Sequence, residues 1–245
     1  MTIAPVLILG GRSDIGRAVA HRFARAGHPI QLAVRNPETV AADARDIELR
    51  HGVGVSLHAF DALETAGHAA FLDTLDPLPG IAVCAVGLLG DQAESERDMA
   101  AATRVMRSNF EAPALLLGEL ANRFEARGSG TLVGISSVAG ERGRATNYVY
   151  GSAKSGFTAF LSGLRNRLAG KGVHVVTVLP GFVRTRMTEG MDLPARLTAT
   201  PEAVAEAIFR AVKKRRDSLH VLPVWALVMA VIRNIPERVF KRMRI

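Results

Sequence analysis

The sequence lacks a second cysteine, a long apolar run and a leader segment. A single cysteine among 245 residues excludes a disulfide-stapled scaffold and a zinc site built from several cysteines. No apolar run reaches the roughly 18–20 residues that a membrane-spanning helix requires, and the nearest candidate, 219–232, is interrupted by His220 and Pro223. The N-terminus shows no basic segment followed by an apolar core, as a signal peptide would, so we expect a cytoplasmic protein.

Acidic residues are scarce only near the C-terminus. The formal net charge is +8, and residues 213–245 alone hold nine cations and two acids, a net charge of +7. The rest of the chain is therefore nearly neutral. No basic-aromatic groove or known nucleic-acid-binding module is visible in the sequence, so we expect no nucleic-acid partner. The hydrophobic fraction of 48% is too high for a disordered chain.

The chain does contain a regular alternation of short apolar runs with longer helical stretches. This spacing predicts βαβ units in one α/β domain, a doubly wound Rossmann-type parallel sheet of about seven strands with helices on both faces. We expect the domain to span 1–245, with 223–245 as an apolar and basic extension. The expected strands are 5–9, 30–34, 53–60, 81–86, 130–136, 173–179 and 219–222. The expected helices are 15–26, 36–50 with Asn36 as N-cap, 64–75, 92–127 with a break near Pro113, 148–169 and 200–214.

A glycine-rich turn joins the first strand to the first helix, where a doubly wound fold binds a dinucleotide. Its residues are Gly10-Gly11-Arg12-Ser13-Asp14-Ile15-Gly16. Small residues let the backbone approach a pyrophosphate, and the helix N-terminus supplies N–H donors. A tight turn without a ligand could use the same residues, but the position directly after the first strand favours cofactor binding.

The end of the second strand indicates which nicotinamide cofactor is used. An acid about 20 residues past the glycines would bond the ribose 2′-hydroxyl of NAD. The chain has Arg35 at the end of this strand and no acid, and Arg35 could pair with a 2′-phosphate together with Arg12. Both arginines could instead be solvated surface charges. We expect NADP(H) as cofactor, with NAD(H) as the alternative.

A tyrosine and a lysine stand four residues apart at the start of a predicted helix. Tyr150 and Lys154 therefore share one helix face. An ammonium beside a phenol favours the phenolate, so we expect Lys154 to lower the pKa of Tyr150 from about 10. Such a phenol can exchange a proton with a substrate. Ser137 follows the strand 130–136, at the edge of the sheet where ligands bind in such folds.

The chain resembles the short-chain dehydrogenase/reductase superfamily over nearly its whole length. The resemblance is carried by the Tyr-x-x-x-Lys pair, by Ser137 before it, by Asn109 on the preceding helix and by the run Pro180-Gly181-Phe182-Val183-Arg184-Thr185. It implies that Tyr150 exchanges a proton with the substrate oxygen and that Ser137 hydrogen-bonds the same oxygen. Lys154 would hold the nicotinamide ribose, and Asn109 would support a water that relays protons to Lys154.

The resemblance also implies a set of cofactor-binding residues and no metal. Val183 and Thr185 would contact the carboxamide, and Asp61 would bond the adenine amine. Besides Tyr150 and Lys154, the expected set is Gly10, Arg12, Ser13, Asp14, Ile15, Gly16, Arg35, Asp61, Ala62, Val86, Gly87, Pro180, Gly181, Val183 and Thr185.

Two regions depart from the family's pattern. The glycine turn has Leu9 where the family has threonine, and Asp14 where it has glycine. A carboxylate beside a pyrophosphate is unfavourable unless it points away or caps the helix. After the fourth strand, Cys84-Ala85-Val86-Gly87 replaces the family's Asn-Asn-Ala-Gly, so the strand-bridging asparagine is missing.

In these two regions the chain resembles a narrower group, the keto-reductase partner of the decaprenylphosphoryl-ribose epimerase. The shared features are the glycine turn, the run 86–91 and a proline followed by a basic C-terminus. The resemblance implies reduction of a 2-keto-pentofuranose carried on a polyprenyl phosphate, with loop 186–200 covering the substrate. The alternatives are a 3-oxoacyl or steroid-like ketone as substrate and, as a different class, a cofactor-binding sensor without turnover.

The last residues form an apolar segment, 223–232, followed by a basic one, 233–245. A basic amphipathic segment with one tryptophan can lie in a membrane interface. The same apolar run could instead pack on the domain or on another subunit. We expect a homodimer or homotetramer with a small-molecule or lipid-linked carbonyl substrate, and a tail suited to peripheral contact with the inner face of the membrane.

Overall fold

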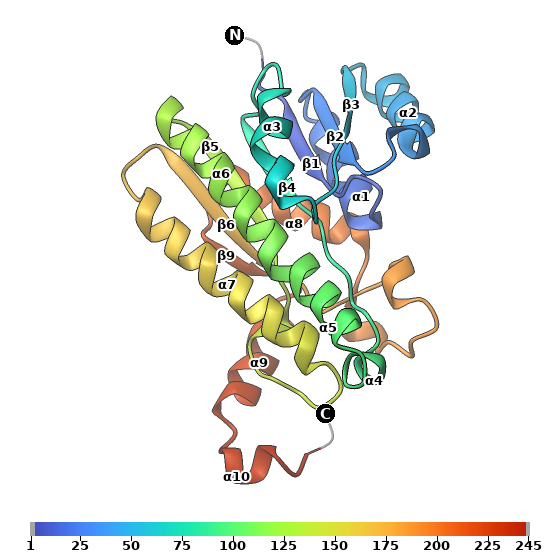
Figure 1. Cartoon of the computed structure of the whole chain (residues 1–245), viewed down its shortest axis with the longest axis vertical. Helices are drawn as coiled ribbons and strands as arrows, with labels where there is room; N and C mark the ends of the chain where they lie inside the picture. The colour runs from blue at the N-terminus through green and yellow to red at the C-terminus, as the bar shows by residue number, and fades with distance from the viewer. Residues whose placement is uncertain (1–2, 244–245) are drawn as a thin grey trace.

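A seven-stranded parallel sheet forms the centre of the molecule, for which a computed structural model describes residues 3–243 (Figure 1). The strand order β3-β2-β1-β4-β5-β6-β9 confirms the expected doubly wound sheet. The first three strands are added towards one edge and the later strands towards the other, so the strand order switches between β1 and β4. A ligand crevice forms at such a switch point. The strands are β1 (Val6–Leu9), β2 (Ile30–Val34), β3 (Val55–Ala59), β4 (Ile81–Cys84), β5 (Gly130–Ile135), β6 (Val173–Leu179) and β9 (Ser218–His220), with a separate pair β7 (Phe182–Val183) and β8 (Thr198–Ala199).

Helices cover both faces of the sheet (Figure 1). One face carries α1 (Asp14–Ala24), α2 (Ala41–His51) and α8 (Pro201–Lys213), and the other carries α3 (His68–Asp73), α6 (Ala112–Arg127) and α7 (Tyr148–Leu168). Strand β1 is fully buried and sends alternate side chains into the two cores. Burial on both faces explains why this strand is apolar throughout.

Helix starts follow side-chain caps where the sequence supplies them. Thr200 caps α8, because its hydroxyl accepts a 3.2 Å hydrogen bond from the Ala203 N–H. Asn36 stands at the N-cap position as expected, but its side chain makes no capping hydrogen bond, and the element it begins is a 3-10 turn, η1 (Pro37–Val40), which precedes α2.

The long helix expected over 92–127 is divided after Ser95 and again at a π-helical turn that ends two residues before Pro113, near the expected break. It comprises α4 (Gln92–Ser95), α5 (Met99–Met106), a π-helical turn η3 (Arg107–Glu111) and α6. Asp98 separates α4 from α5, because its carboxylate accepts the Ala100 N–H at 2.8 Å and starts a new helix. Pro113 lies in the first turn of α6, where a proline is tolerated. The helix expected over 64–75 is likewise divided, into η2 (Thr65–Gly67) and α3.

The C-terminal extension folds back onto the domain as α9 (Val224–Asn234) and α10 (Glu237–Phe240) (Figure 1). Trp225 and Met229 are buried in a small third core with Val138 and Leu179. The opposite face of α9 is exposed. Within residues 3–243, no helix is both long and apolar enough to cross a membrane. The last two residues of the basic tail, including Arg244, lie outside the described residues.

Candidate active site

The glycine turn after β1 is tightly closed and leaves bare backbone at the start of α1. Gly10 has φ +84°, and a Cβ there would lie 3.1 Å from the backbone of Ala85. A Cβ on Gly16 would approach the Gly10 oxygen to 2.6 Å. The Ser13 hydroxyl closes the turn, because it donates to the Gly10 carbonyl at 2.9 Å and accepts the Gly16 N–H at 3.0 Å. The turn therefore fits the close approach of a pyrophosphate to backbone N–H groups.

Two unpaired arginines and one aspartate surround the ends of β1, β2 and β3. Arg12 and Arg35 are both exposed, and within residues 3–243 neither guanidinium has an ionic or hydrogen-bonding partner. Their positions leave both cations accessible to an anion at the end of β2. Asp61 lies two residues past β3, and one of its oxygens accepts the Leu63 N–H at 3.0 Å. The neighbouring Ala62 uses its carbonyl to accept a hydrogen bond from a ring nitrogen of His68.

Asn109 lies in the π-helical turn and is fully buried. Its amide donates to the carbonyls of Leu88 at 2.6 Å and Val105 at 2.8 Å, so it ties the segment after β4 to this helix. A Cβ on Gly87 would lie 3.0 Å from the Asn109 oxygen and 3.5 Å from Lys154 Nζ. The structure thus brings Asn109, Gly87 and Lys154 together around one small space.

Tyr150, Lys154 and Ser137 meet where β5 ends and α7 begins. Lys154 Nζ lies 5.7 Å from the centre of the Tyr150 ring and donates to the Ile135 carbonyl at 3.0 Å. Ser137 accepts the Ala139 N–H at 3.1 Å, so its hydroxyl is held at the first residue of η4 (Val138–Gly140). Ser136, which the sequence reasoning missed, donates to the Lys154 carbonyl at 2.9 Å and thereby joins α7 to β5.

The pKa of Tyr150 departs from the sequence-based expectation. Burial raises the pKa of Tyr150 to about 12, and a side-chain hydrogen bond with Ser137 acts in the opposite direction. Burial also lowers the pKa of Lys154 to about 8. Desolvation disfavours both charged forms, which is why the expected lowering of the phenol pKa by Lys154 does not appear. The phenol therefore holds its proton at neutral pH, as a general acid requires.

Cys84 occupies the position of the family's missing asparagine. Its side chain is buried, and burial raises the pKa of the Cys84 thiol to about 11. The thiol is therefore neutral at physiological pH and does not supply the amide that the family's asparagine would place there.

The segment after β6 carries the expected Pro180–Thr185 run. Pro180 accepts the Val138 N–H at 3.0 Å, which fixes it beside Ser137. Gly181 packs against the indole of Trp225 so closely that a Cβ would lie 2.0 Å from it. Val183 is buried in β7, and the Thr185 N–H donates to the Thr188 hydroxyl at 3.1 Å. Ile15, on the glycine turn, packs against the core beneath α1.

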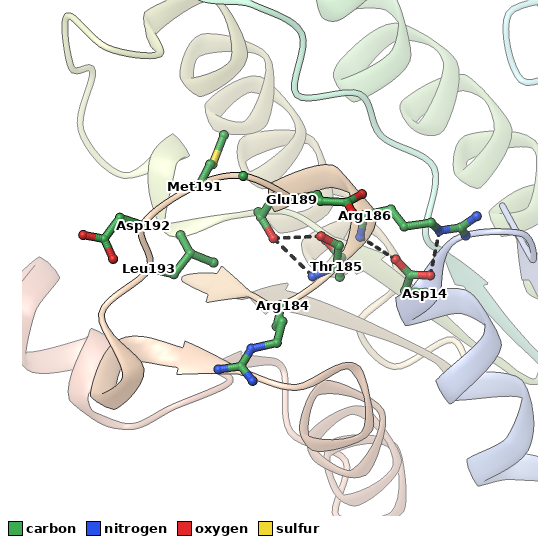
Figure 2. Close-up of a pocket in the computed structure, with 10 residues that line it drawn as sticks. Asp14, Arg184, Thr185, Arg186, Glu189, Met191, Asp192 and Leu193 are labelled. Atoms are coloured by element: carbon green, nitrogen blue, oxygen red, sulfur yellow. Dashed lines mark hydrogen bonds and ion pairs between the residues drawn. The ribbon is translucent and has the colours of Figure 1, made fainter.

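A pocket of about 620 Å³ lies between the glycine turn and this segment (Figure 2). One ion pair crosses its edge: Arg186 Nε lies 2.9 Å from Asp14 Oδ1. The carboxylate that departs from the family's glycine is therefore neutralised by an arginine that the sequence reasoning did not assign. The lining residues are Asp14, Arg184, Thr185, Arg186, Thr188, Glu189, Gly190, Met191, Asp192 and Leu193.

Ion pairs and hydrogen bonds join the C-terminal part of the chain to the loop between Ser137 and Tyr150. Glu141 pairs with His220 Nε2 at 2.9 Å and with Arg233 at 3.3 Å. Arg142 donates to the Arg233 carbonyl at 3.1 Å and pairs with Glu237 at 2.7 Å. These contacts span 79 to 95 residues of sequence, and no short-range pattern could have revealed them.

The same loop holds two buried polar atoms without partners in the described structure, Arg144 Nε and Asn147 Oδ1. They precede Tyr150 by six and three residues. Burial lowers the pKa of the Arg144 guanidinium. Among residues 3–243, no group of three or more histidine, cysteine, aspartate or glutamate side chains is arranged to hold a metal ion.

Comparison with known proteins identifies close relatives across the whole chain. The family model described as short chain dehydrogenase matches residues 4–195. An uncharacterized oxidoreductase of Mycobacterium tuberculosis is 43% identical over 98% of this chain and 97% of its own length. A ketoacyl reductase of a Nostoc species is 25% identical over 90% of this chain and 79% of its own length. A short-chain dehydrogenase from Sphingobium yanoikuyae, solved in complex with NADPH, superimposes with a TM-score of 0.82 at 25% identity and covers 96% of this chain and 97% of its own.

Proposed function

Since the chain belongs to the short-chain dehydrogenase family and is an NAD(P)-dependent oxidoreductase, we propose that Asn109, Ser137, Tyr150 and Lys154 carry its reaction. The reaction is transfer of a hydride between NADP(H) and a ketone or secondary alcohol. The observation that carries this proposal is the convergence of these side chains, from η3, β5 and α7, beside the crevice where the sheet reverses. The family gives the reaction type, and the geometry supports this choice of residues.

The residues around the glycine turn fit NADP(H). Glycines at 10 and 16 leave no room for side chains, so bare backbone faces a pyrophosphate. Arg12 and Arg35 offer uncompensated positive charge for a 2′-phosphate. The Sphingobium yanoikuyae relative binds NADPH, which supports the same cofactor here. When bound, the nicotinamide supplies the hydride for the carbonyl carbon.

Each side chain of the site then has a defined task. In reduction, Tyr150 donates its proton to the carbonyl oxygen, and its raised pKa keeps that proton available at neutral pH. Ser137 donates a hydrogen bond to the same oxygen. Lys154, fixed by the Ile135 carbonyl, has its ammonium 5.7 Å from the centre of the phenol ring and would hold the nicotinamide ribose. Asn109 holds the segment after β4 in place, and its side-chain oxygen lies next to Gly87, which also borders Lys154.

For the substrate, we propose a keto-sugar carried on an anionic lipid. Arg144 supports this choice, because a buried guanidinium nitrogen with no partner in the described structure favours an anionic ligand. The Asn147 oxygen, three residues before Tyr150, is likewise buried without a partner in the described structure. A 3-oxoacyl thioester is the second candidate, since the Nostoc relative is named a ketoacyl reductase. NADPH oxidation against soluble keto-sugars, lipid-linked keto-sugars and 3-oxoacyl thioesters distinguishes them, and absence of turnover on every ketone would contradict the proposal.

Replacing Arg144 by leucine tests whether it recognises an anion. We expect Arg144→Leu to raise KM for a phosphate-bearing ketone by about tenfold, because one charge-assisted hydrogen bond is worth roughly 1.5–3 kcal/mol. KM for a small neutral ketone should stay unchanged and serves as the internal control. Steady-state kinetics on the two substrates measure the difference. An equal loss on both would show that Arg144 only supports the loop.

The outer face of α9 supports a contact with the membrane surface. Val224, Leu227 and Val231 are exposed along one side of this helix, and Leu227 is 69% exposed. Exposed cations follow at Arg238 and Lys241. Apolar side chains next to cations suit an anionic lipid surface, and such a surface would present a lipid-linked substrate to the site.

Placing acids on this face tests the membrane contact without disturbing the buried side of α9. We expect the double variant Leu227→Glu/Val231→Glu to lose about tenfold in affinity for anionic phosphatidylglycerol vesicles, because two exposed apolar groups no longer enter the interface. Co-sedimentation with vesicles is the measurement. Leu49→Glu, on the exposed side of α2, is the matched control. Unchanged binding of the double variant would remove the membrane proposal.

A second copy of the chain is the other partner we propose, as a homodimer or homotetramer. Large apolar side chains are exposed along α5, η3 and α6, which lie next to one another in the chain. Exposed apolar side chains of this size are typical of subunit contacts. The residues concerned are Met99, Met106, Phe110 and Leu115.

A further inference from the structure

Asp14 connects the glycine turn to the segment that closes the pocket. The Arg186 backbone N–H donates to Asp14 Oδ2 at 2.8 Å, and Arg186 Nε donates to Oδ1 at 2.9 Å. Arg186 Nη2 also donates to the Arg12 carbonyl at 2.5 Å. The carboxylate is thus held by both the main chain and the side chain of a residue 172 positions away, as Figure 2 shows.

Apart from this contact, the hydrogen bonds that join the loop carrying Arg186 to the rest of the described structure lie at the base of the loop. At the base, the Arg184 N–H donates to the Ala199 carbonyl at 3.0 Å, and Trp225 Nε1 donates to the Leu197 carbonyl at 3.0 Å. Thr188 closes a turn within the loop by donating to Val183 at 2.7 Å. Among the described residues, the hydrogen bonds between this loop and the glycine turn are those of Arg186.

The contact between Asp14 and Arg186 affects ligand exchange because of where it lies. Asp14 and Arg186 both line the pocket of about 620 Å³ between the turn and the loop. While the contact is made, the loop and the turn that would hold the pyrophosphate cannot separate. The side chain of Asp14 is 23% exposed and that of Arg186 is 56% exposed, so the carboxylate is the more sheltered partner of the pair.

We propose that Asp14 is a positioning residue which, through Arg186, holds loop 184–199 closed against the glycine turn and slows exchange of the bound dinucleotide. This rests on the proposed function for the identity of the ligand, but the closure itself is a property of the chain alone. The carboxylate that breaks the family's glycine pattern would thereby couple the cofactor turn to the loop that covers the substrate.

The closure can be measured without cofactor. Glu189 is exposed in the middle of the loop and offers a cleavage site for a glutamate-specific protease. We expect Asp14→Asn and Arg186→Gln each to speed cleavage after Glu189 by roughly three- to tenfold, the range of a well-oriented ion pair. The double variant should gain little over Arg186→Gln alone, because both substitutions weaken the same ion pair. Asp43→Asn, which breaks the pair between Arg17 on α1 and Asp43 on α2, is the matched control and should cleave as the unaltered protein does.

The effect on the ligand is measured by stopped-flow dissociation of NADPH. Closure predicts a three- to tenfold faster release from Asp14→Asn. A carboxylate that only repelled the pyrophosphate would give the opposite sign, slower release after its removal. Unchanged cleavage at Glu189, or release that is unchanged or slower, would overturn the proposal. Failure of the unaltered protein to bind NADPH would contradict the proposed function and leave the cleavage result to decide the closure.

Discussion

Tyr150→Phe is expected to lower the rate of NADPH-dependent ketone reduction by roughly 10²–10⁴-fold, the contribution of a positioned general acid. The phenol is the one group at this site that combines a proton retained at neutral pH with a place beside both Ser137 and Lys154. Phenylalanine keeps the ring and loses only the hydroxyl. The measurement is single-turnover oxidation of NADPH in the presence of saturating ketone.

Two controls separate the loss of a proton donor from damage to the fold. Tyr148 lies two residues earlier on α7 and is 46% exposed, so Tyr148→Phe should retain full activity. Tyr150→Phe should also bind NADPH with nearly unchanged affinity, because the glycine turn is untouched. Substantial turnover by Tyr150→Phe would mean that another group protonates the substrate.

The second large effect is expected at the cofactor's 2′-phosphate. We expect Arg12→Ala/Arg35→Ala to weaken NADPH binding by about 10²-fold, each arginine contributing about tenfold, or about 1.4 kcal/mol. NADH, which has no 2′-phosphate, should bind the double variant as it binds the unaltered protein. Fluorescence titration with both cofactors gives the ratio directly.

The matched control for this pair is Arg25→Ala, which removes an exposed cation from the far end of α1. It should leave both affinities unchanged. Added salt should weaken NADPH binding to the unaltered protein more than to the double variant, because exposed charges are screened. An equal loss for NADH and NADPH would assign the arginines to the general electrostatics of the turn.

Local patterns sufficed for the sheet and for most of the proposed site. The apolar runs, the glycine turn and the Tyr-x-x-x-Lys spacing are short-range signals, and the structure brings Ser137, Tyr150 and Lys154 together as expected. The prediction of one continuous helix over 92–127 was wrong for a reason that is also local. Asp98 starts a new helix, which hydrophobic periodicity does not reveal.

What the sequence could not provide depends on burial and on distant contacts. The pKa of Tyr150 rises because the site is desolvated, and a helix-face argument takes no account of desolvation. The pairing of Asp14 with Arg186 joins residues from opposite ends of the chain. The tail allowed two alternatives in the sequence, and the structure uses its two faces differently: Trp225 and Met229 pack on the domain, while Leu227 and Val231 remain exposed.

The ion pairs that join α9 and α10 to the loop before Tyr150 affect the order of folding. Glu141 and Arg142 find their partners only when residues 220–237 are present. Domains generally fold as units, and both α8, which packs against α1, and β9, which pairs with β6, follow β6 in the chain. The loop between Ser137 and Tyr150 therefore becomes fixed only after residues 220–237 have been synthesised, so the site is not complete before the C-terminal helices are in place.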